Sequence, residues 1–395
     1  MTVENSDLGP TLRALRDLAP SDITDSLVRL VRRVGAYDIT LYLIDFEQST
    51  LVPIPDRTAH VDSPIGVSTE GTLEGTAFVE RRLASETHGA VTRVCVPIVE
   101  GSDYTGVLAF RVVGNLDADV HERSEELGMV AGAAIAIAAR YTDLFNLVRR
   151  RKAMSLQASI QWDLLPPLRL KTPNATSCGV LEPAYDVGGD FFDHAVNGPT
   201  LDVAIMDAMG HGLHSSIVSS LAAGSYRHDR REGQPLSVIH RQLDDVIADN
   251  FHGEDFVTGQ LARLDLASGH LSWISAGHPR PLHVRNGKVI STLHCNPSLP
   301  WGLGSPLAQE AVVGLRPGDS VVFYSDGVVE GRLRGGGETF GTNRLISIIE
   351  GAAASSIPTD AILRLAIKAV LDYQDHRLRD DATILWLTWV PRTDD

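Results

Sequence analysis

The chain has 395 residues, and its content of 43% apolar and 22% charged residues is that of a protein with two or three ordinary globular domains. Asp and Glu outnumber Lys and Arg by 50 to 35, which gives a formal charge of −15. This acidic balance argues against partners that present many phosphates. We therefore expect the chain to bind neither nucleic acid nor an anionic membrane surface.

The cysteines and the N-terminus indicate the compartment. Cys95, Cys178 and Cys295 are far apart, so they predict neither a disulfide framework nor a zinc site. The first ten residues lack the basic and apolar segments of a signal peptide. The most apolar stretch, residues 130–139, is shorter than the roughly 20 residues that cross a bilayer. We expect a cytoplasmic protein.

The first third of the chain alternates between helical and hairpin patterns. Residues 1–20 form a loose lead-in, and the helical spacing of apolar residues that follows ends at Gly35. Two hairpins are predicted, each from a pair of apolar runs separated by a polar turn. A short helix is predicted between them. The segments in order are 39–46 with 50–55, then 73–84, then 93–100 with 106–113.

This order of helix, hairpin, helix, hairpin and long helix resembles a GAF sensor domain over residues 21–148. A PAS-like sensor is the alternative. The resemblance implies a signal, either a small molecule or a protein, that binds this domain. Cys95 lies within a predicted strand, which favours a small buried residue over an anchor for a chromophore.

Residues 118–165 have a helical pattern that contains an apolar seam and a break in its phase. The seam comprises Ile137, Tyr141, Leu144 and Val148. The basic run 149–152 interrupts it and is typical of a solvated face. The region is either the last helix of one domain and the first of the next, or one long signalling helix that dimerises the chain. We favour the signalling helix, and with it a homodimer.

Residues 166–395 alternate short strands with separate runs of helix. Two helices are predicted over 213–225 and 235–247, and two more over 342–353 and 358–372. Strands surround them, and Asn286-Gly287 is a strong two-residue hairpin turn. The pattern predicts an α+β fold with two sheets and helices outside them.

Carboxylates follow or precede the apolar strands of this region. Asp190 follows two glycines, Asp207 and Asp326 each end a strand, and Asp380-Asp381 precede the last strand. A single Asp beside Gly is usually a turn residue. Several carboxylates gathered by strand ends would repel one another unless cations neutralise them, and hard divalent cations prefer such oxygen ligands. The set therefore predicts a metal centre.

Five motifs in this order resemble the metal-dependent type 2C (PPM) serine/threonine protein phosphatases, in their bacterial SpoIIE-like (RsbU-type) branch. The resemblance covers residues 166–395 and implies an αββα layered sandwich. The motifs are G-G-D-F-F-D, M-D-A-M-G-H-G, S-A-G-H-P, Y-S-D-G-V-V-E and D-D-A-T-I-L.

The resemblance implies two Mn²⁺ or Mg²⁺ ions and a role for each ligand. Asp207 would bridge the two ions, and the backbone carbonyl of Ala208 would add a ligand. Asp326 would bind one ion, Asp380 would be the last ligand, and Asp190 would hold a metal or its waters. The ions would lower the pKa of water, so that it attacks phosphorus, and would stabilise charge on the phosphate.

Several positions leave the mechanism open. Where eukaryotic relatives place a histidine that is a candidate general acid, this chain has Met209, and His211 follows two positions later. His211 is therefore a candidate general acid, a helix cap or a turn residue. The arginine that grips phosphate in eukaryotic relatives has no evident equivalent. His278 reads as the polar tip of a turn, and Trp273 and Trp301 read as core residues.

The resemblance implies a protein serine/threonine phosphatase regulated by the N-terminal sensor. The expected substrate is a phosphorylated anti-sigma-factor antagonist, a small STAS-type protein. One alternative is a phosphatase-like scaffold without activity, although such scaffolds usually lose the carboxylates that this chain retains. Another is a two-metal hydrolase of nucleotides, which predicts a nucleotide pocket or basic groove that the sequence does not show.

Overall fold

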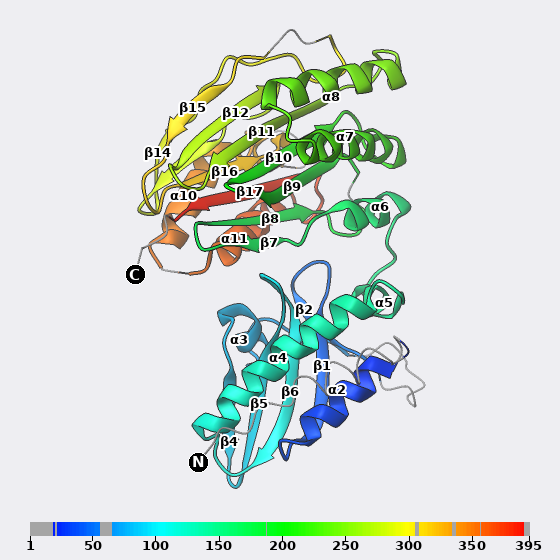
Figure 1. The fold of residues 1–395 in the computed structure, drawn as a ribbon, viewed down its shortest axis with the longest axis vertical. Coiled ribbons are helices and arrows are strands. Elements are labelled where there is room, and N and C mark those ends of the chain that lie inside the picture. Colours follow the sequence, from blue (N-terminus) through cyan, green and yellow to red (C-terminus); the bar gives the residue numbers. More distant parts are fainter. Residues whose placement is uncertain are drawn as a thin grey trace. The chain divides into compact units, whose positions relative to one another are not determined.

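The computed structural model describes residues 19, 22–55, 65–186, 188–304, 308–333, 337–355 and 357–390. The predicted lead-in, residues 1–20, lies almost entirely outside them. The chain forms two compact units, Met1–Ala153 and Met154–Asp395. Figure 1 labels their elements. No helix in the described ranges is long and apolar enough to cross a membrane.

The first unit is an antiparallel six-stranded sheet in the order β3-β2-β1-β6-β5-β4, with helices on both faces. Its strands are β1 (Tyr37–Ile44), β2 (Thr50–Pro53), β3 (Val67–Ser68), β4 (Ala84–His88), β5 (Val91–Glu100) and β6 (Asp103–Val113). Alternation along each strand divides the core: Leu41 and Leu43 face α2 (Ile23–Arg32) and α4 (Ala118–Ala138), whereas Tyr42 and Ile44 face α3 (Leu73–Glu80). Cys95 is fully buried on the α3 side, as the sequence predicts.

The prediction of one long helix over residues 118–165 is wrong. The region contains three helices, α4, α5 (Leu144–Arg149) and α6 (Leu156–Leu164). The predicted seam is divided, because Leu144 and Val148 pack against the core of the first unit whereas Ile137 and Tyr141 are 62% and 75% exposed. The Ser155 hydroxyl caps the start of α6.

The basic run 149–152 forms the predicted solvated face only in part, because Arg151 and Lys152 are exposed whereas Arg149 and Arg150 are half-buried. Arg149 Nε donates to the carbonyl of Ile44 at 3.0 Å, and Arg151 Nη1 donates to Thr50 Oγ1 at 2.7 Å. Lys152 pairs with Glu47 at 2.5 Å. These bonds hold the chain beyond α5 against the β1–β2 hairpin, which explains why the helix ends there.

The second unit contains two antiparallel sheets. One has the order β15-β12-β11-β10-β9 and the other β14-β13-β16-β17-β8-β7. The strands of the first are β9 (Asp190–Asn197), β10 (Thr200–Ala208), β11 (Val257–Asp265), β12 (His270–Ala276) and β15 (Ala311–Gly314). Those of the second are β7 (Arg169–Lys171), β8 (Ala175–Glu182), β13 (Leu282–Arg285), β14 (Lys288–Thr292), β16 (Ser320–Tyr324) and β17 (Ala382–Trp389).

Alternation along the strands builds an αββα sandwich from these sheets. On β10, Val203 and Ile205 join the core between the sheets, whereas Ala204 and Met206 pack with α7 (Leu213–Arg231) and α8 (Leu236–Phe251). On the other sheet, Phe323 faces the inter-sheet core. The opposite face of that sheet packs with α10 (Thr342–Ala353) and α11 (Thr359–Tyr373). The predicted layers are therefore confirmed.

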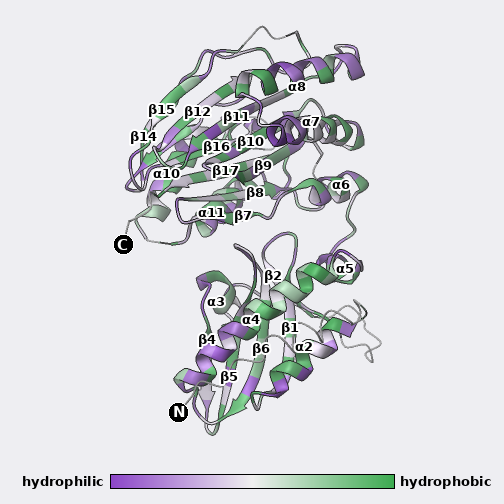
Figure 2. Ribbon diagram, viewed as in Figure 1, coloured by the Kyte–Doolittle hydropathy of each residue, from purple (hydrophilic) through white to green (hydrophobic). Residues whose placement is uncertain are grey.

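Two local predictions also hold. Asn286 and Gly287 have φ values of 49° and 72°, as a tight hairpin turn between β13 and β14 requires. Trp273 and Trp301 are 3% and 0% exposed. Figure 2 shows hydrophobic and hydrophilic residues alternating around α2, as expected of a helix with one buried side.

Candidate metal centre

The predicted carboxylates come from strand ends in both sheets. Asp190 begins β9 and lies directly opposite Asp207, near the end of β10. Asp326 follows β16 and begins the short helix α9 (Asp326–Val329), and Asp380 precedes β17. Ser325 links the sheets, because its hydroxyl donates to Asp190 Oδ2 at 2.7 Å and accepts from the Thr383 amide at 3.0 Å.

The pKa values show that these carboxylates influence one another. Burial raises the pKa of Asp207 to about 8, and the charges of Asp326, Asp380 and Asp381 add to the effect. Burial, followed by the charges of Asp207 and Asp381, holds the pKa of Asp190 well above its ordinary value. The pKa values of Asp326 and Asp380 are raised as well, first by burial. The charges of Asp326 and Asp380 therefore act on Asp207, and the charge of Asp207 acts on Asp190.

Asp381 fixes the backbone that carries Asp190. Its Oδ2 accepts hydrogen bonds from the amides of Gly188, Gly189 and Asp190 at 2.8, 2.7 and 3.2 Å. Burial nevertheless keeps its pKa above the ordinary value. Ser325 and Asp381 are thus positioning residues that connect β9, β16 and β17. The resemblance implies that Asp380 is the ligand and that Asp381 supports it, and the structure shows Asp381 supporting the backbone of Asp190.

Glycine is required at two close approaches beside the carboxylates. A Cβ atom at Gly189 would lie 2.6 Å from the carbonyl oxygen of Ala208, the predicted backbone ligand. A Cβ atom at Gly327 would lie 2.0 Å from the carbonyl oxygen of Asp381. Any side chain at either position would push apart segments that carry the predicted ligands.

Two further ionisable residues of the motifs, Asp193 and His211, lie in different places. Asp193, in the same motif as Asp190, is buried and pairs with Arg227 and Arg230 of α7, so its role is structural. His211 is exposed in the loop before α7. Its positive charge partly offsets the rise in the pKa of Asp380 that burial causes.

The donor set fits hard divalent cations. All side-chain donors are carboxylates, and the Ala208 carbonyl adds another oxygen. No three Asp, Glu, His or Cys side chains of the described ranges converge closely enough to form a complete protein cage. Mg²⁺ keeps several waters and binds through one or two carboxylates, so partial protein coordination is what this ion takes. Asp190, Asp207, Asp326 and Asp380 would hold such ions.

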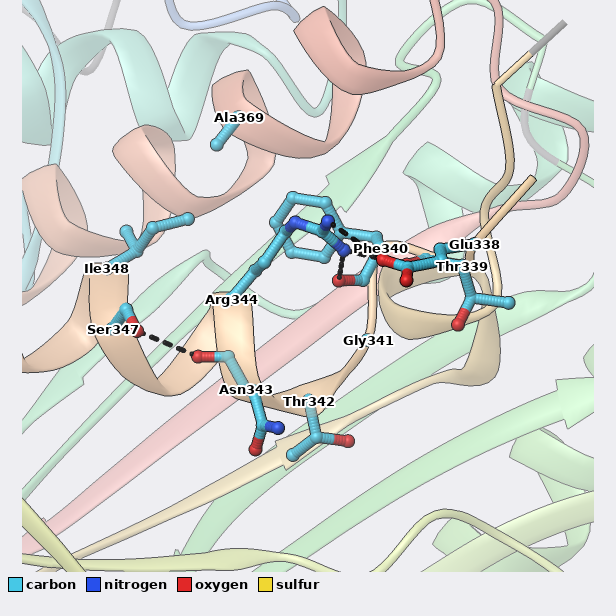
Figure 3. Close-up of a pocket in the computed structure, with 10 residues that line it drawn as sticks. All are labelled: Glu338, Thr339, Phe340, Gly341, Thr342, Asn343, Arg344, Ser347, Ile348 and Ala369. Atoms are coloured by element: carbon cyan, nitrogen blue, oxygen red, sulfur yellow. Dashed lines mark hydrogen bonds and ion pairs between the residues drawn. The ribbon is translucent and has the colours of Figure 1, made fainter.

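Two cavities lie on this side of the second unit. One, of about 640 Å³, is lined by Asp326 together with Thr258, His278 and Arg280. The other, of about 1020 Å³, lies over α10 and α11 (Figure 3). Arg344 lines it and donates through Nη1 to the carbonyls of Thr339 and Phe340, and none of the predicted ligands lines it. The smaller cavity, which contains the predicted ligand Asp326, is therefore the candidate site for a substrate.

Known proteins match this unit in both sequence and fold. Residues 197–390 match the family Stage II sporulation protein E (SpoIIE). The second unit belongs to the SpoIIE family. The chain is 23% identical to phosphoserine phosphatase RsbU of Bacillus subtilis over 240 residues, which cover 60% of this chain and 70% of RsbU.

Two solved structures have the same fold as the SpoIIE-family unit. The SiaA-PP2C domain of Pseudomonas aeruginosa has a TM-score of 0.51 at 20% identity, over 58% of this chain and 93% of that domain. The RsbU and RsbW domains of Rv1364c from Mycobacterium tuberculosis have a TM-score of 0.50 at 24% identity, over 57% of this chain and 63% of that one. These matches confirm the PP2C fold predicted for this half of the chain.

Proposed function

We propose that the SpoIIE-family unit is a Mn²⁺- or Mg²⁺-dependent phosphatase that hydrolyses phosphoserine or phosphothreonine in a protein. The position of Asp190, Asp207, Asp326 and Asp380 at strand ends of a PP2C fold, each with a pKa raised first by burial, carries this proposal. The similarity to RsbU, which is named a phosphoserine phosphatase, supports it. We further propose two ions, and an anti-sigma-factor antagonist of the STAS type as the substrate.

Different residues of this chain would have different roles in the reaction. The carboxylates would hold the ions, which when bound activate water and neutralise the charge on the phosphate. Ser325 and Asp381 hold the ligand-bearing segments in register. His211, beside Asp380, is the candidate donor of a proton to the leaving serine oxygen.

Phosphate release from a phosphorylated STAS-type protein tests the proposed activity. The full chain should release phosphate with Mn²⁺ and should stop when EDTA is added. A chain that releases phosphate equally well in EDTA would contradict the metal-dependent mechanism. A chain that leaves the STAS-type protein intact but hydrolyses other phosphoserine proteins would contradict only the proposed substrate.

We propose that α6 transmits the state of the GAF-like sensor to the metal centre. Gln161 of α6 is fully buried, and its Nε2 donates to the backbone carbonyl of Asp190 and, at 3.3 Å, to Ser219 Oγ. Arg227 of α7 donates to the carbonyl of Leu164, at the end of the same helix, at 2.6 Å. A displacement of α6 would therefore move the backbone of a predicted ligand.

Gln161→Ala is expected to weaken metal binding, because the Asp190 backbone loses a buried hydrogen bond. We expect the Mn²⁺ concentration for half-maximal activity to rise by roughly tenfold, since one buried hydrogen bond contributes about 1 kcal/mol or more. Asp163→Ala, on the exposed side of α6, is the control. An unchanged Mn²⁺ requirement in Gln161→Ala would reject the role of α6.

We also propose that the chain dimerises through the exposed side of α4. Met129 and Ile137 of α4 are 55% and 62% exposed, and Tyr141, just beyond the helix, is 75% exposed. The exposed Ala133 between them would allow a second helix to approach closely. Ile137→Glu should convert a dimer to a monomer in sedimentation velocity, because the carboxylate would be buried in the interface. Glu122→Ala, elsewhere on α4, should remain dimeric. A monomeric wild type, or a dimeric Ile137→Glu, would reject the interface.

A further inference from the structure

The cavity beside Asp326 contains an arginine that the proposed metal centre does not use. It measures about 640 Å³, and Arg280 lines it together with Thr258, His278, Tyr324 and Asn343. Arg280 is exposed, and it makes no hydrogen bond or ion pair with the described residues. Two carboxylates, Asp326 and Glu330, line the same cavity, yet neither pairs with it. The guanidinium is therefore available to a ligand.

The loop that carries Arg280 is held rigidly against β11. His278 is 7% exposed, and its Nδ1 lies 2.9 Å from Thr258 Oγ1. Gln260 donates to the carbonyl of Pro279, and Gly277 forms a bridge with Gly259. A loop fixed in this way loses little conformational freedom when it binds a ligand, which is the arrangement expected of a recognition site.

The register of the sheet places this loop at a defined separation from the metal centre. Thr258 lies directly opposite Asp207 on the neighbouring strand, and the loop bonds to the far side of β11. Strands in a sheet are about 4.8 Å apart, so the start of this loop at Gly277 lies roughly 10 Å from the backbone of Asp207. An extended peptide advances about 3.3 Å per residue, so this separation corresponds to two or three residues.

We propose that Arg280 binds an acidic side chain two or three residues from the phosphoserine of the protein substrate; this rests on the function proposed above. A guanidinium forms paired hydrogen bonds with a carboxylate, which a neutral amide cannot match. The neighbouring Asp326 and Glu330 would repel an acidic segment that lacked this contact. The cavity would then select substrates by charge next to the reacting residue, apart from the phosphate itself.

Binding of a non-hydrolysable substrate analogue tests the inference. Two fluorescent peptides would carry the phosphonate analogue of phosphoserine, with Glu or Gln two and three residues on each side of it. Affinities would be measured with Mn²⁺ for the full-length wild type, Arg280→Ala and Arg241→Ala. Arg241 is an exposed arginine of α8, so its variant changes the net charge equally. Tryptophan fluorescence would verify that each variant is folded.

We expect the wild type and Arg241→Ala to prefer the Glu peptide by roughly tenfold or more, and Arg280→Ala to lose or reverse that preference. Equal weakening of both peptides would overturn the proposal, because Arg280 would then bind the phosphonate. An unchanged preference in Arg280→Ala would overturn it as well, as would a wild type that binds neither peptide. A wild type that shows the Arg280-dependent preference but does not hydrolyse the phosphoserine peptides would contradict only the proposed function.

Discussion

Asp207→Asn is expected to lower kcat/KM for a phosphoserine protein by roughly 1000-fold or more, equivalent to about 4 kcal/mol of transition-state stabilisation. Asp207 is the carboxylate on which the charges of Asp326, Asp380 and Asp381 all act, so it lies at the centre of the cluster. Asparagine keeps the shape but cannot supply the negative charge that two cations require. The loss should persist at saturating Mn²⁺.

The same substitution should not destabilise the metal-free protein. Asp207 is opposed by like charges and by burial, so replacing it with a neutral amide removes repulsion. Thermal unfolding in EDTA should therefore occur at the same temperature as in the wild type or higher, whereas added Mn²⁺ should stabilise only the wild type. Asp249→Asn, at an exposed position of α8, is the control. A variant that keeps wild-type turnover, or that loses activity only by unfolding, would contradict the assignment.

Asp193→Ala is expected to destabilise the SpoIIE-family unit by about 3–5 kcal/mol. Asp193 is 2% exposed, and its carboxylate accepts from Arg227 Nε at 2.5 Å and lies 3.3 Å from Arg230 Nη1. Removing it leaves Arg230, which is 8% exposed, without this buried charge partner. Arg227 also bonds the end of α6, so the contact between α6 and α7 should loosen.

Urea unfolding followed by tryptophan fluorescence measures this loss in the full-length chain. All five tryptophans lie between residues 162 and 389, so their emission reports on the SpoIIE-family unit alone. Asp249→Ala, on the exposed face of α8, should unfold at the wild-type urea concentration. A loss of less than about 1 kcal/mol in Asp193→Ala would show that the buried pair does not hold α7 in place.

Much of the fold follows from local patterns in the sequence. Uninterrupted apolar runs predict β10 and β16, which are buried almost throughout. Helical spacing predicts α7 and α8, because it shows which side of each helix faces the core. Asn286-Gly287 predicts its hairpin because few other residues adopt positive φ at both positions. The carboxylates at strand ends likewise predict a metal centre, and the assignment of its ligands stays a prediction.

The incorrect predictions concern contacts between residues far apart in the sequence. The second break in the helical region 118–165 lies where Arg149 and Arg151 bond to the β1–β2 hairpin. This hairpin lies about 100 residues earlier in the sequence, so helical spacing cannot predict the contact. His278 is buried rather than at a polar tip, because Thr258 of β11 binds its ring.

The central claim is that folding gathers carboxylates from two sheets into a site for divalent cations. Anomalous diffraction from crystals of the protein soaked in Mn²⁺ would test it most directly. The account predicts anomalous peaks within coordination distance of Asp207, with Asp326, Asp380 or Asp190 as further ligands. Crystals that bind Mn²⁺ only at other positions, while the protein in solution remains an active Mn²⁺-dependent phosphatase, would contradict it.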